Sequence, residues 1–385
     1  MLRDTQGVAP SHVVLAIDLY PIVARMNGRH TCEEIAKEVA RESGTRVAVS
    51  DVVQVANELE AALFADGAPY RKARARIEKE FADAAVRPAS HAGGAYYGER
   101  DKLVEYIDKD CLAAAKPNGN GSAGRLVGLV APHIDPWRGA RCYGHAYAAM
   151  RRDLPADVDT FVVFGTSHAP MREPFALCRK AFDTPLGRAE AHFDAIDAIA
   201  RSCDFDPYFD QFNHKREHSL EFQVVFLQHL LATRRRNVRI VPILAGLGDE
   251  QSSGNDPEQR ARNARFLDAV RKVVDDHHAV VIAGADLAHV GPRFGDEAPF
   301  DDGQREALGE TDRESIGYAE ANDHRAFWRH VAADLDTRRV CGLGPIYSLL
   351  RTIDPSARGV LGHYEQTVDP DEGSIVSHAA MGFYK

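Results

Sequence analysis

Short apolar runs that alternate with helix-forming segments constrain the fold of this 385-residue chain more than any other feature of its sequence. The runs are rich in Val, Ile and Leu and are bounded by Gly, Pro or polar residues; they cover residues 126–131, 161–164, 238–244 and 279–283. Such runs are typical of strands that are buried on both faces of a sheet. Residues 217–231 repeat Leu and Val at helical spacing. The alternation predicts an α/β fold, a three-layer sandwich around a central mixed or parallel sheet.

The first 87 residues lack this alternation and predict a small, mainly helical domain, which leaves residues 88–385 for the α/β domain. Thr31 and Glu34 have the spacing of a capping box, in which each side chain bonds the main-chain NH of the other at a helix start. Gly44 suits the end of that helix, and Ser50 is the expected cap of a second one. Two short helices predict a helix-turn-helix-like or winged-helix module.

A basic run from Arg71 to Lys79 follows these helices and has two interpretations, a DNA contact or a solvated helix face. The net charge of the chain is −10, with 57 acidic against 47 basic residues, which argues against a nucleic-acid binder. We therefore interpret the run as a solvated face. Residues 117–124, which are rich in Gly and Asn, predict a flexible loop before the first strong strand.

Composition also bears on membranes, secretion and disulfides. No window approaches eighteen uninterrupted apolar residues, so we expect no membrane-spanning helix. The start of the chain lacks the pattern of a secretion signal, and we expect a cytoplasmic protein. The six cysteines include no Cys-x-x-Cys pair, so neither a disulfide framework nor a cysteine-rich zinc site is expected.

Three of the 17 histidines follow predicted strands closely: His133, His168 and His289. In open α/β sheets the ligand crevice lies at the carboxyl ends of the strands, where the connecting loops gather. A single histidine there is more often structural. Three at equivalent positions predict a common site, and histidine is the commonest side-chain metal ligand.

Carboxylates accompany two of these positions. Asp286 lies three residues before His289, so the two side chains share a face if the turn between them is helical. Glu217 and His218 begin the predicted helix over residues 217–231. An acidic residue there is also explained by the helix dipole alone.

Cys341 precedes a segment in which Pro345 is expected as the first residue of a helix. A thiol near a helix N-terminus has its thiolate stabilised, which favours metal binding or nucleophilic chemistry. The alternative is a small buried hydrophobic residue. Eight other histidines are interpreted as ordinary surface or loop residues: His12, His91, His214, His229, His277, His278, His324 and His330.

Residues 88–385 resemble the Memo family, known in bacteria and archaea as the AmmeMemoRadiSam system protein B. The resemblance is carried by an ordered set of motifs: Ala-Gly at 92–93 with Tyr-Tyr at 96–97, Ala-Pro-His at 131–133, Gly-Thr-Ser-His at 165–168, Glu-His-Ser-Leu-Glu at 217–221, Ala-Asp-Leu-Ala-His at 285–289, and Cys-Gly at 341–342 with Gly-Pro-Ile at 344–346. The turn at residues 27–31 resembles small peptide-chaperone domains of the PqqD type.

The Memo resemblance implies a fold like that of class III extradiol dioxygenases, whose iron is held by two His and one Glu. His133 and His168 match the two histidine ligands, and Cys341 stands where the dioxygenases have Glu. Asp286, His289 and His218 match further pocket residues with acid–base roles. A divalent metal is implied, with Fe(II) favoured; the thiolate is softer than a carboxylate and also suits copper or zinc.

The chain departs from the usual family pattern after His133, where residues 134–139 replace the common Ala-Gly-Tyr. We expect Asp135 and Trp137 to lie at the pocket rim and, with Glu217, to contact a substrate. The alternative is a rigid turn with a packed Trp137.

These observations predict a metal-dependent, dioxygenase-like oxidoreductase that acts on a small substrate. An aromatic compound is one candidate for that substrate. A binding protein for a peptide and a zinc hydrolase are the alternatives. The family resemblance also implies radical SAM and AMMECR-type partner proteins.

Overall fold

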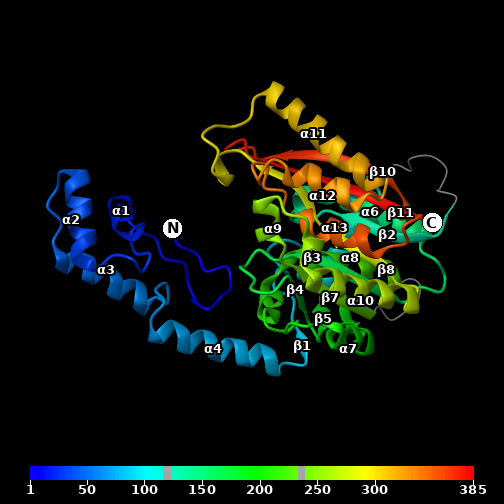
Figure 1. Ribbon diagram of the computed structural model, residues 1–385, viewed down its shortest axis with the longest axis horizontal. Helices are drawn as coiled ribbons and strands as arrows, with labels where there is room; N and C mark the ends of the chain where they lie inside the picture. The colour runs from blue at the N-terminus through cyan, green and yellow to red at the C-terminus, as the bar shows by residue number, and fades with distance from the viewer. Residues whose placement is uncertain (116–123, 233–238) are drawn as a thin grey trace. The chain divides into compact units, whose positions relative to one another are not determined.

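A computed structural model describes residues 1–115, 124–232 and 239–385 (Figure 1). The chain divides into two compact units, Met1–Ala84 and Ala85–Lys385. This division lies three residues before the boundary expected after residue 87. Apart from Gly124, the predicted loop 117–124 lies outside the described residues.

The N-terminal unit is built from short helices around a small apolar core. They are η1 (Ile17–Leu19), α1 (Tyr20–Val23), α2 (Cys32–Ser43), α3 (Val49–Ala61) and α4 (Ala68–Asp83). The capping box of Thr31 and Glu34 starts α2, and Gly44 ends it in the left-handed conformation, as predicted. The prediction for Ser50 is wrong, because α3 is capped at Ala48, whose NH donates to the Asp51 carboxylate.

The basic run of the N-terminal unit lies on α4, where acids one turn further along pair with it. Arg76 contacts Glu80 at 2.8 Å and Lys79 contacts Asp83 at 2.6 Å, both with exposed side chains. Such pairs each stabilise a helix by about 0.2–0.5 kcal/mol, which agrees with a solvated face. Over residues 1–84, all of them described, β-pairing is limited to an isolated bridge from Leu2 to Val13. The winged-helix form of the prediction is therefore wrong, because a wing needs paired strands.

The second unit contains a mixed sheet, which confirms the predicted α/β class. Its strands are β1 (Val86–Arg87), β2 (Leu126–Ala131), β3 (Thr160–Thr166), β4 (Phe175–Leu177), β5 (Ala181–Thr184), β6 (Gly187–Ala191), β7 (Arg239–Ala245), β8 (Val280–Gly284), β9 (Asp286–Val290), β10 (Arg358–Val368) and β11 (Ile375–Tyr384). In the described residues the strand order is β1-β5-β6-β7-β3-β8-β2-β11-β10, with β4 on β7 and β9 on β11. The four predicted runs form β2, β3, β7 and β8, which are parallel neighbours at the centre.

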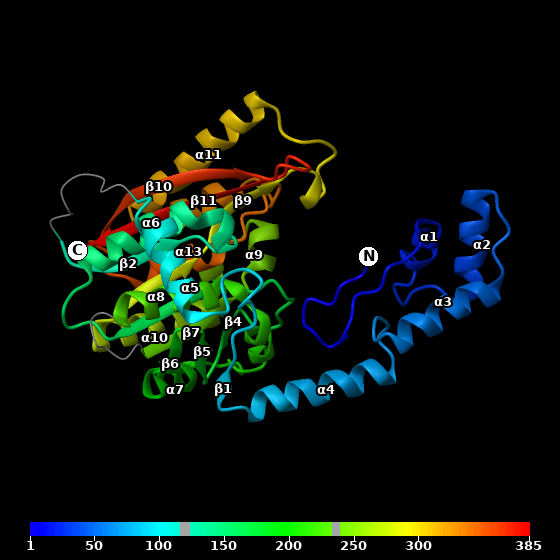
Figure 2. The same cartoon turned by 180° about the vertical axis from the view of Figure 1, so that it is seen from behind.

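Helices cover both faces of this sheet and complete the three layers (Figures 1 and 2). One face carries α6 (Pro136–Asp153) and α8 (His218–Ala232); the other carries α10 (Ala261–His277) and α13 (Leu343–Thr352). The remaining helices of this unit are α5 (Arg100–Tyr106), η2 (Ile107–Leu112), α7 (Phe193–Ser202), η3 (Gln211–Arg216), α9 (Gly248–Ser253), η4 (Pro257–Gln259), η5 (Pro292–Phe294), α11 (Asp302–Glu320) and α12 (His324–Ala332).

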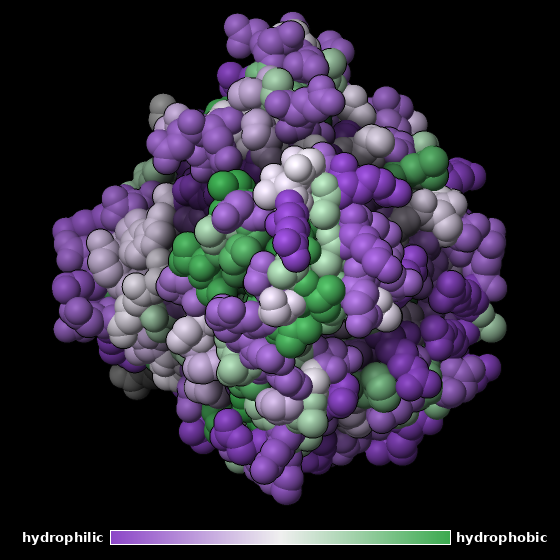
Figure 3. Space-filling view, turned by 90° about the vertical axis from the view of Figure 1, so that its left-hand side faces the viewer, coloured by the Kyte–Doolittle hydropathy of each residue, from purple (hydrophilic) through white to green (hydrophobic). Residues whose placement is uncertain are grey.

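Three further features bear on the expectations from composition: the polarity of the surface, the length of the helices and the state of the cysteines. On the face drawn in Figure 3, hydrophobic groups lie among hydrophilic side chains. None of the described helices has the length and apolar character needed to cross a bilayer. All six cysteines are free thiols in this structure.

The start of α8 packs directly on the sheet at two glycines. A Cβ added to Gly284 would lie 2.2 Å from the Ser219 carbonyl oxygen, and one added to Gly165 would lie 2.5 Å from the Ser219 hydroxyl. No side chain fits between the helix and the sheet here. The first turn of α8 is therefore held against the ends of β3 and β8.

Replacing Gly284 by alanine is expected to lower the free energy of unfolding by about 1–3 kcal/mol, because the new methyl group overlaps main-chain atoms. Urea denaturation measures this change. Gly317→Ala in α11 is the control, since its added Cβ meets nothing within 4 Å. That variant should gain about 0.5–1 kcal/mol from the better helix propensity of alanine. Equal midpoints for Gly284→Ala and the wild type would contradict the close approach.

The carboxyl ends of the central strands lie level with one another. Ala131 and Gly165 are both register partners of Gly284, and Thr166 is the partner of Ala245. A residue two positions beyond one strand therefore meets its counterparts beyond the neighbouring strands. His133 and His168 each stand two positions beyond their strand.

Candidate metal centre

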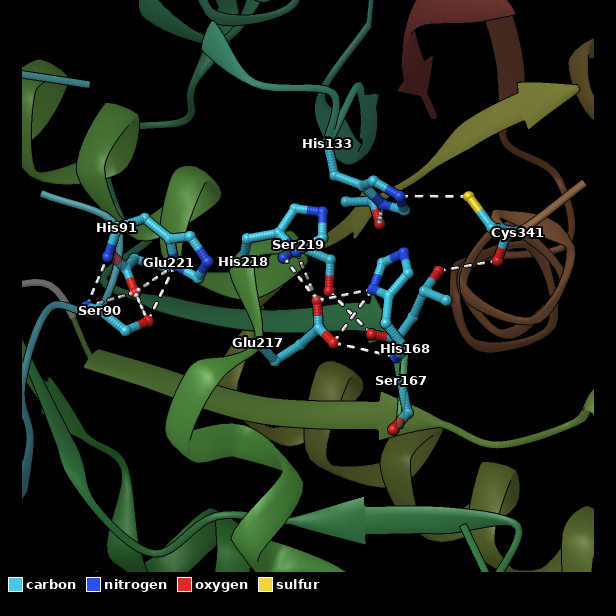
Figure 4. Close-up of polar contacts among 12 residues, drawn as sticks. Ser90, His91, His133, Ser167, His168, Glu217, His218, Ser219, Glu221 and Cys341 are labelled. Carbon is cyan, nitrogen blue, oxygen red and sulfur yellow. Dashed lines mark hydrogen bonds and ion pairs between the residues drawn. The ribbon is translucent and has the colours of Figure 1, made fainter. Parts of the chain in front are cut away.

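His133, His168 and Cys341 converge at the level carboxyl ends of the strands (Figure 4). One ligand atom from each lies within 4.8 Å of the others, close enough for a single cation. The Nε2 atom of His133 is 3.1 Å from the Sγ atom of Cys341. The sequence prediction named these three residues as ligands, and the structure brings them together.

The His133 ring is fixed from its far side. Its Nδ1 atom lies 2.9 Å from the Gly284 carbonyl oxygen, which can only accept, so Nδ1 carries the proton. The Nε2 lone pair is therefore free to bind a metal. Burial lowers the pKa of His133 and keeps the ring neutral. The side-chain amide of Gln223 donates to the Pro132 carbonyl at 2.9 Å and holds the preceding residue in place.

The His168 ring is oriented by a carboxylate. Its Nδ1 atom lies 3.0 and 3.1 Å from the two carboxylate oxygens of Glu217, and its main-chain NH donates to the same carboxylate. Burial opposes protonation of His168, but the Glu217 charge outweighs it and raises the pKa of the imidazole. A carboxylate bonded to Nδ1 is the usual support of a metal-binding histidine. Glu217, expected to contact a substrate, thus has a partner inside the protein.

Cys341 stands directly before Gly342, the N-cap of α13. This helix begins at Leu343, so the expectation that Pro345 is its first residue is wrong by two positions. The hydroxyl of Thr166 donates to the Cys341 carbonyl at 2.7 Å. Burial and the nearby Asp286 charge raise the pKa of the thiol well above its usual value. The helix start therefore does not stabilise a thiolate by itself, contrary to the sequence prediction.

These residues fit a soft or borderline divalent cation. Two imidazoles present Nε2 atoms whose Nδ1 partners are already in place, and the third donor is a sulfur atom. A thiol loses its proton on coordination, and a cation supplies the positive charge that the buried sulfur lacks.

His218 lies against the other two histidines. Its ring stacks on that of His168 with centroids 4.5 Å apart, and its centroid is 5.3 Å from that of His133. Burial and the neighbouring imidazoles lower the pKa of His218 to about 3, against the effect of Glu217. The ring is therefore neutral near neutral pH. His168, Glu217 and His218 form a second group whose ligand atoms lie within 4.8 Å of one another.

Asp286 reaches the centre, but His289 does not bond to it. One Asp286 oxygen accepts from the His133 main-chain NH at 2.8 Å, and the other lies 3.7 Å from His133 Nε2. Residues 286–290 form strand β9 rather than the expected helical turn, and its pairing with β11 is irregular between Asp286 and His289, so simple alternation of side chains does not hold there. Burial lowers the pKa of His289 to about 4, and the charges of Asp286 and His133 also act on this ring, which therefore lies near the centre. The His289 Nδ1 atom faces the Leu287 carbonyl at 3.2 Å, and its ring packs edge-on against Phe294.

Asp135 and Trp137, expected at the pocket rim, have structural partners. Asp135 caps α6 by accepting from the Arg138 main-chain NH at 3.1 Å. The Trp137 ring packs edge-on against Tyr97 and Tyr106, with centroids 4.6 and 4.8 Å away. These contacts match the alternative interpretation, a rigid turn with a packed tryptophan.

Some residues of this region escaped the sequence prediction. Glu221 is buried, forms an ion pair with buried Arg87 and accepts from the Tyr96 hydroxyl at 2.5 Å. His91, interpreted as a surface residue, lies 3.3 Å from Glu221 through Nδ1 and packs against His218. The surface interpretation of His214 is wrong, because the residue is fully buried and its Nε2 donates to the Ala176 carbonyl at 3.0 Å. The second glutamate of the 217–221 motif, one helical turn after the first, was the available signal.

Replacing Glu217 by glutamine is expected to weaken metal binding by about 10- to 100-fold, because His168 loses the carboxylate that fixes its ring. Competition with a chromophoric chelator measures the affinity. Glu190→Gln, at an exposed position of β6, is the control and should bind as the wild type does. An unchanged affinity for Glu217→Gln would contradict the orienting role.

Comparison with known proteins agrees with this architecture. A family model described as "Memo-like protein" matches residues 87–382. A MEMO1 family protein of Aquifex aeolicus is 25% identical over 388 residues, which cover 100% of this chain and 96% of the relative. One of Thermus thermophilus is 29% identical over 77% of this chain and 83% of the relative. One of Thermococcus onnurineus is 30% identical over 54% and 67%. The Aquifex alignment extends over both units of the chain.

Proposed function

The chain belongs to the Memo-like protein family, and from this premise we propose that it is a metal-dependent oxidoreductase, with Fe(II) as the favoured metal and a small molecule as the substrate. One observation carries the proposal: His133, His168 and Cys341 present three donor atoms to one point, and both imidazoles have their other nitrogen occupied by a protein acceptor.

A cation held by these three residues would keep coordination positions for a substrate and for a second small ligand, as non-haem iron oxygenases require. A bound redox-active metal would polarise the substrate and supply one-electron chemistry. The sulfur donor departs from the two-His-one-carboxylate pattern and makes copper and zinc competitors.

His218 is a polar group beside this point that a substrate can contact. Its Nδ1 atom lies 3.3 Å from a carboxylate oxygen of Glu217. Because burial lowers the pKa of His218 to about 3, the neutral ring is a weak base, and its role is to orient a substrate hydroxyl by hydrogen bonding. Asp286 adds a second negative charge next to His133.

The test is anaerobic purification with metal quantification, followed by oxygen-uptake assays with catecholic and related substrates. We expect one metal ion per chain and oxygen consumption that is lost in His133→Ala and Cys341→Ser. Full metal occupancy in both variants would overturn the centre.

A zinc hydrolase is the second candidate, because the cysteine sulfur suits zinc better than iron. The zinc hydrolase would be favoured if the protein retains zinc alone, hydrolyses esters and consumes no oxygen. His218→Ala would then reduce hydrolysis while the zinc content stays at one per chain.

A further inference from the structure

A polar cavity of about 410 Å³ opens beside Cys341. Thr166, Cys341 and Gly344 form the wall on the side of the metal centre. The rest of the wall comes from the segment after β3, the segment after β7, the start of α10 and the segment between α12 and α13. A molecule in this cavity therefore lies against the sulfur ligand.

Four arginines line the cavity, which is a concentration of positive groups in a chain of net charge −10. They are Arg172, Arg260, Arg262 and Arg339. Four acidic residues line it as well: Glu173, Asp249, Glu250 and Asp336. The formal charges cancel, so net charge alone does not identify the ligand.

The arrangement of the acids shows what they do. Glu173 accepts from Arg262 at 3.0 Å and lies 3.8 Å from Arg172. Glu250 is buried and lies 3.2 Å from the Nε atom of Arg260. Each of these carboxylates lies on one edge of a guanidinium group and orients that arginine.

Three of the four guanidinium groups have N–H donors that make no hydrogen bond to the described residues. Each carries five N–H bonds. In the part of the chain that the structure describes, the side chains of Arg172 and Arg260 donate no hydrogen bond, and Arg262 donates one. Arg172 is also held over the Phe209 ring, with its central carbon 4.7 Å from the centroid. Arg339 differs, because its terminal nitrogens already bond Asp296 and main-chain carbonyls.

We propose that this cavity binds an organic anion whose carboxylate or phosphate group is held by Arg172, Arg260 and Arg262. Guanidinium groups recognise both anions through paired N–H donors, which a lysine cannot reproduce. The opposite end of the molecule lies beside Cys341, so the substrate of the metal centre is a polar anion. This last step rests on the proposed function; the anion site itself does not.

The test is calorimetric titration of the full chain with two probes, succinate and inorganic phosphate. In Arg262→Gln we expect the dissociation constant to rise about 10- to 100-fold, as for the loss of charge-assisted hydrogen bonds. Arg262→Lys keeps the positive charge but lacks the paired N–H donors of the guanidinium group, and its dissociation constant should be intermediate. Arg265→Gln is the control: it lies on the same helix, pairs with Asp204 at 2.8 Å and does not line the cavity.

Both probes are titrated into chelator-treated protein and into zinc-loaded protein. Binding of succinate alone assigns a carboxylate ligand, binding of phosphate alone assigns a phosphate ligand, and either supports the site if Arg262→Gln weakens it. Absence of binding, or equal affinities in the wild type, Arg262→Gln and Arg265→Gln, would overturn the anion site while metal binding stands. Anion binding that survives in Cys341→Ser supports this site even where the metal centre fails.

Discussion

Arg87→Met is expected to lower the free energy of unfolding by about 3–5 kcal/mol, because it leaves a buried carboxylate without its counter-charge. Arg87 and Glu221 are both fully buried and pair through Nη1. Arg87 also donates to the His214 carbonyl through Nε and to the Glu217 carbonyl through Nη2, each at 2.9 Å. A methionine fills part of the volume but supplies none of these bonds. Urea denaturation at neutral pH measures the change.

The control for this substitution is Arg265→Met, which breaks an exposed pair and should cost less than about 1 kcal/mol. The double variant Arg87→Met/Glu221→Leu should recover part of the loss, since it removes the uncompensated charge. A change below about 1 kcal/mol for Arg87→Met would contradict the buried-pair account.

The same pair has a predictable pH dependence. Burial opposes ionisation of Glu221, but the Arg87 charge outweighs it and holds the pKa of the carboxyl far below its usual value. Stability from a lowered carboxyl pKa is present above the unfolded pKa of about 4.3 and is lost as the pH falls through the folded pKa. The difference between the wild type and Arg87→Met should therefore be full at pH 7 and shrink in acid.

Cys341→Ser is expected to weaken metal binding by more than about 100-fold, because loss of a direct ligand costs more affinity than loss of a group that hydrogen-bonds to a ligand. A serine hydroxyl does not ionise near neutral pH and is a poor ligand for a borderline metal. Competition with a chelator measures the affinity, and substitution with Co(II) reports the sulfur–metal bond as a charge-transfer band. That band should disappear in Cys341→Ser.

Cys203→Ser is the matched control, since Cys203 is also a free, partly buried thiol but belongs to no ligand group in the described residues. Burial keeps Cys341 protonated, so its replacement should change the stability of the metal-free protein little. A Co(II) spectrum that is unchanged in Cys341→Ser would exclude the sulfur ligand.

The features that could be predicted from sequence depend on neighbours along the chain. Strands β2, β3, β7 and β8 are buried on both faces, so their apolar runs are unbroken and easy to recognise. The α2 cap needs only Thr31 and Glu34. The positions of His133 and His168 follow from the rule that parallel strands end together.

The features that could not be predicted depend on pairing between distant segments. Residues after Gly284 form β9 because β11, some ninety residues further on, pairs with them, and that pairing is irregular between Asp286 and His289. Arg87 meets Glu221 across 134 positions. The arginines of the cavity come from three distant segments, namely the one after β3, the start of α10 and the one before α13.

The ring orientation of His133 and His168 has a kinetic consequence. Because the carbonyl of Gly284 and the carboxylate of Glu217 already aim the two rings, metal uptake needs little rearrangement of the chain. For the proposed centre, the rate of uptake would then depend on water exchange on the incoming ion and on release of the thiol proton. A preformed site with two nitrogens and a sulfur would bind several divalent ions well, and affinity alone would not separate them. The ion that occupies the proposed centre in a cell would then depend on the local supply of metals.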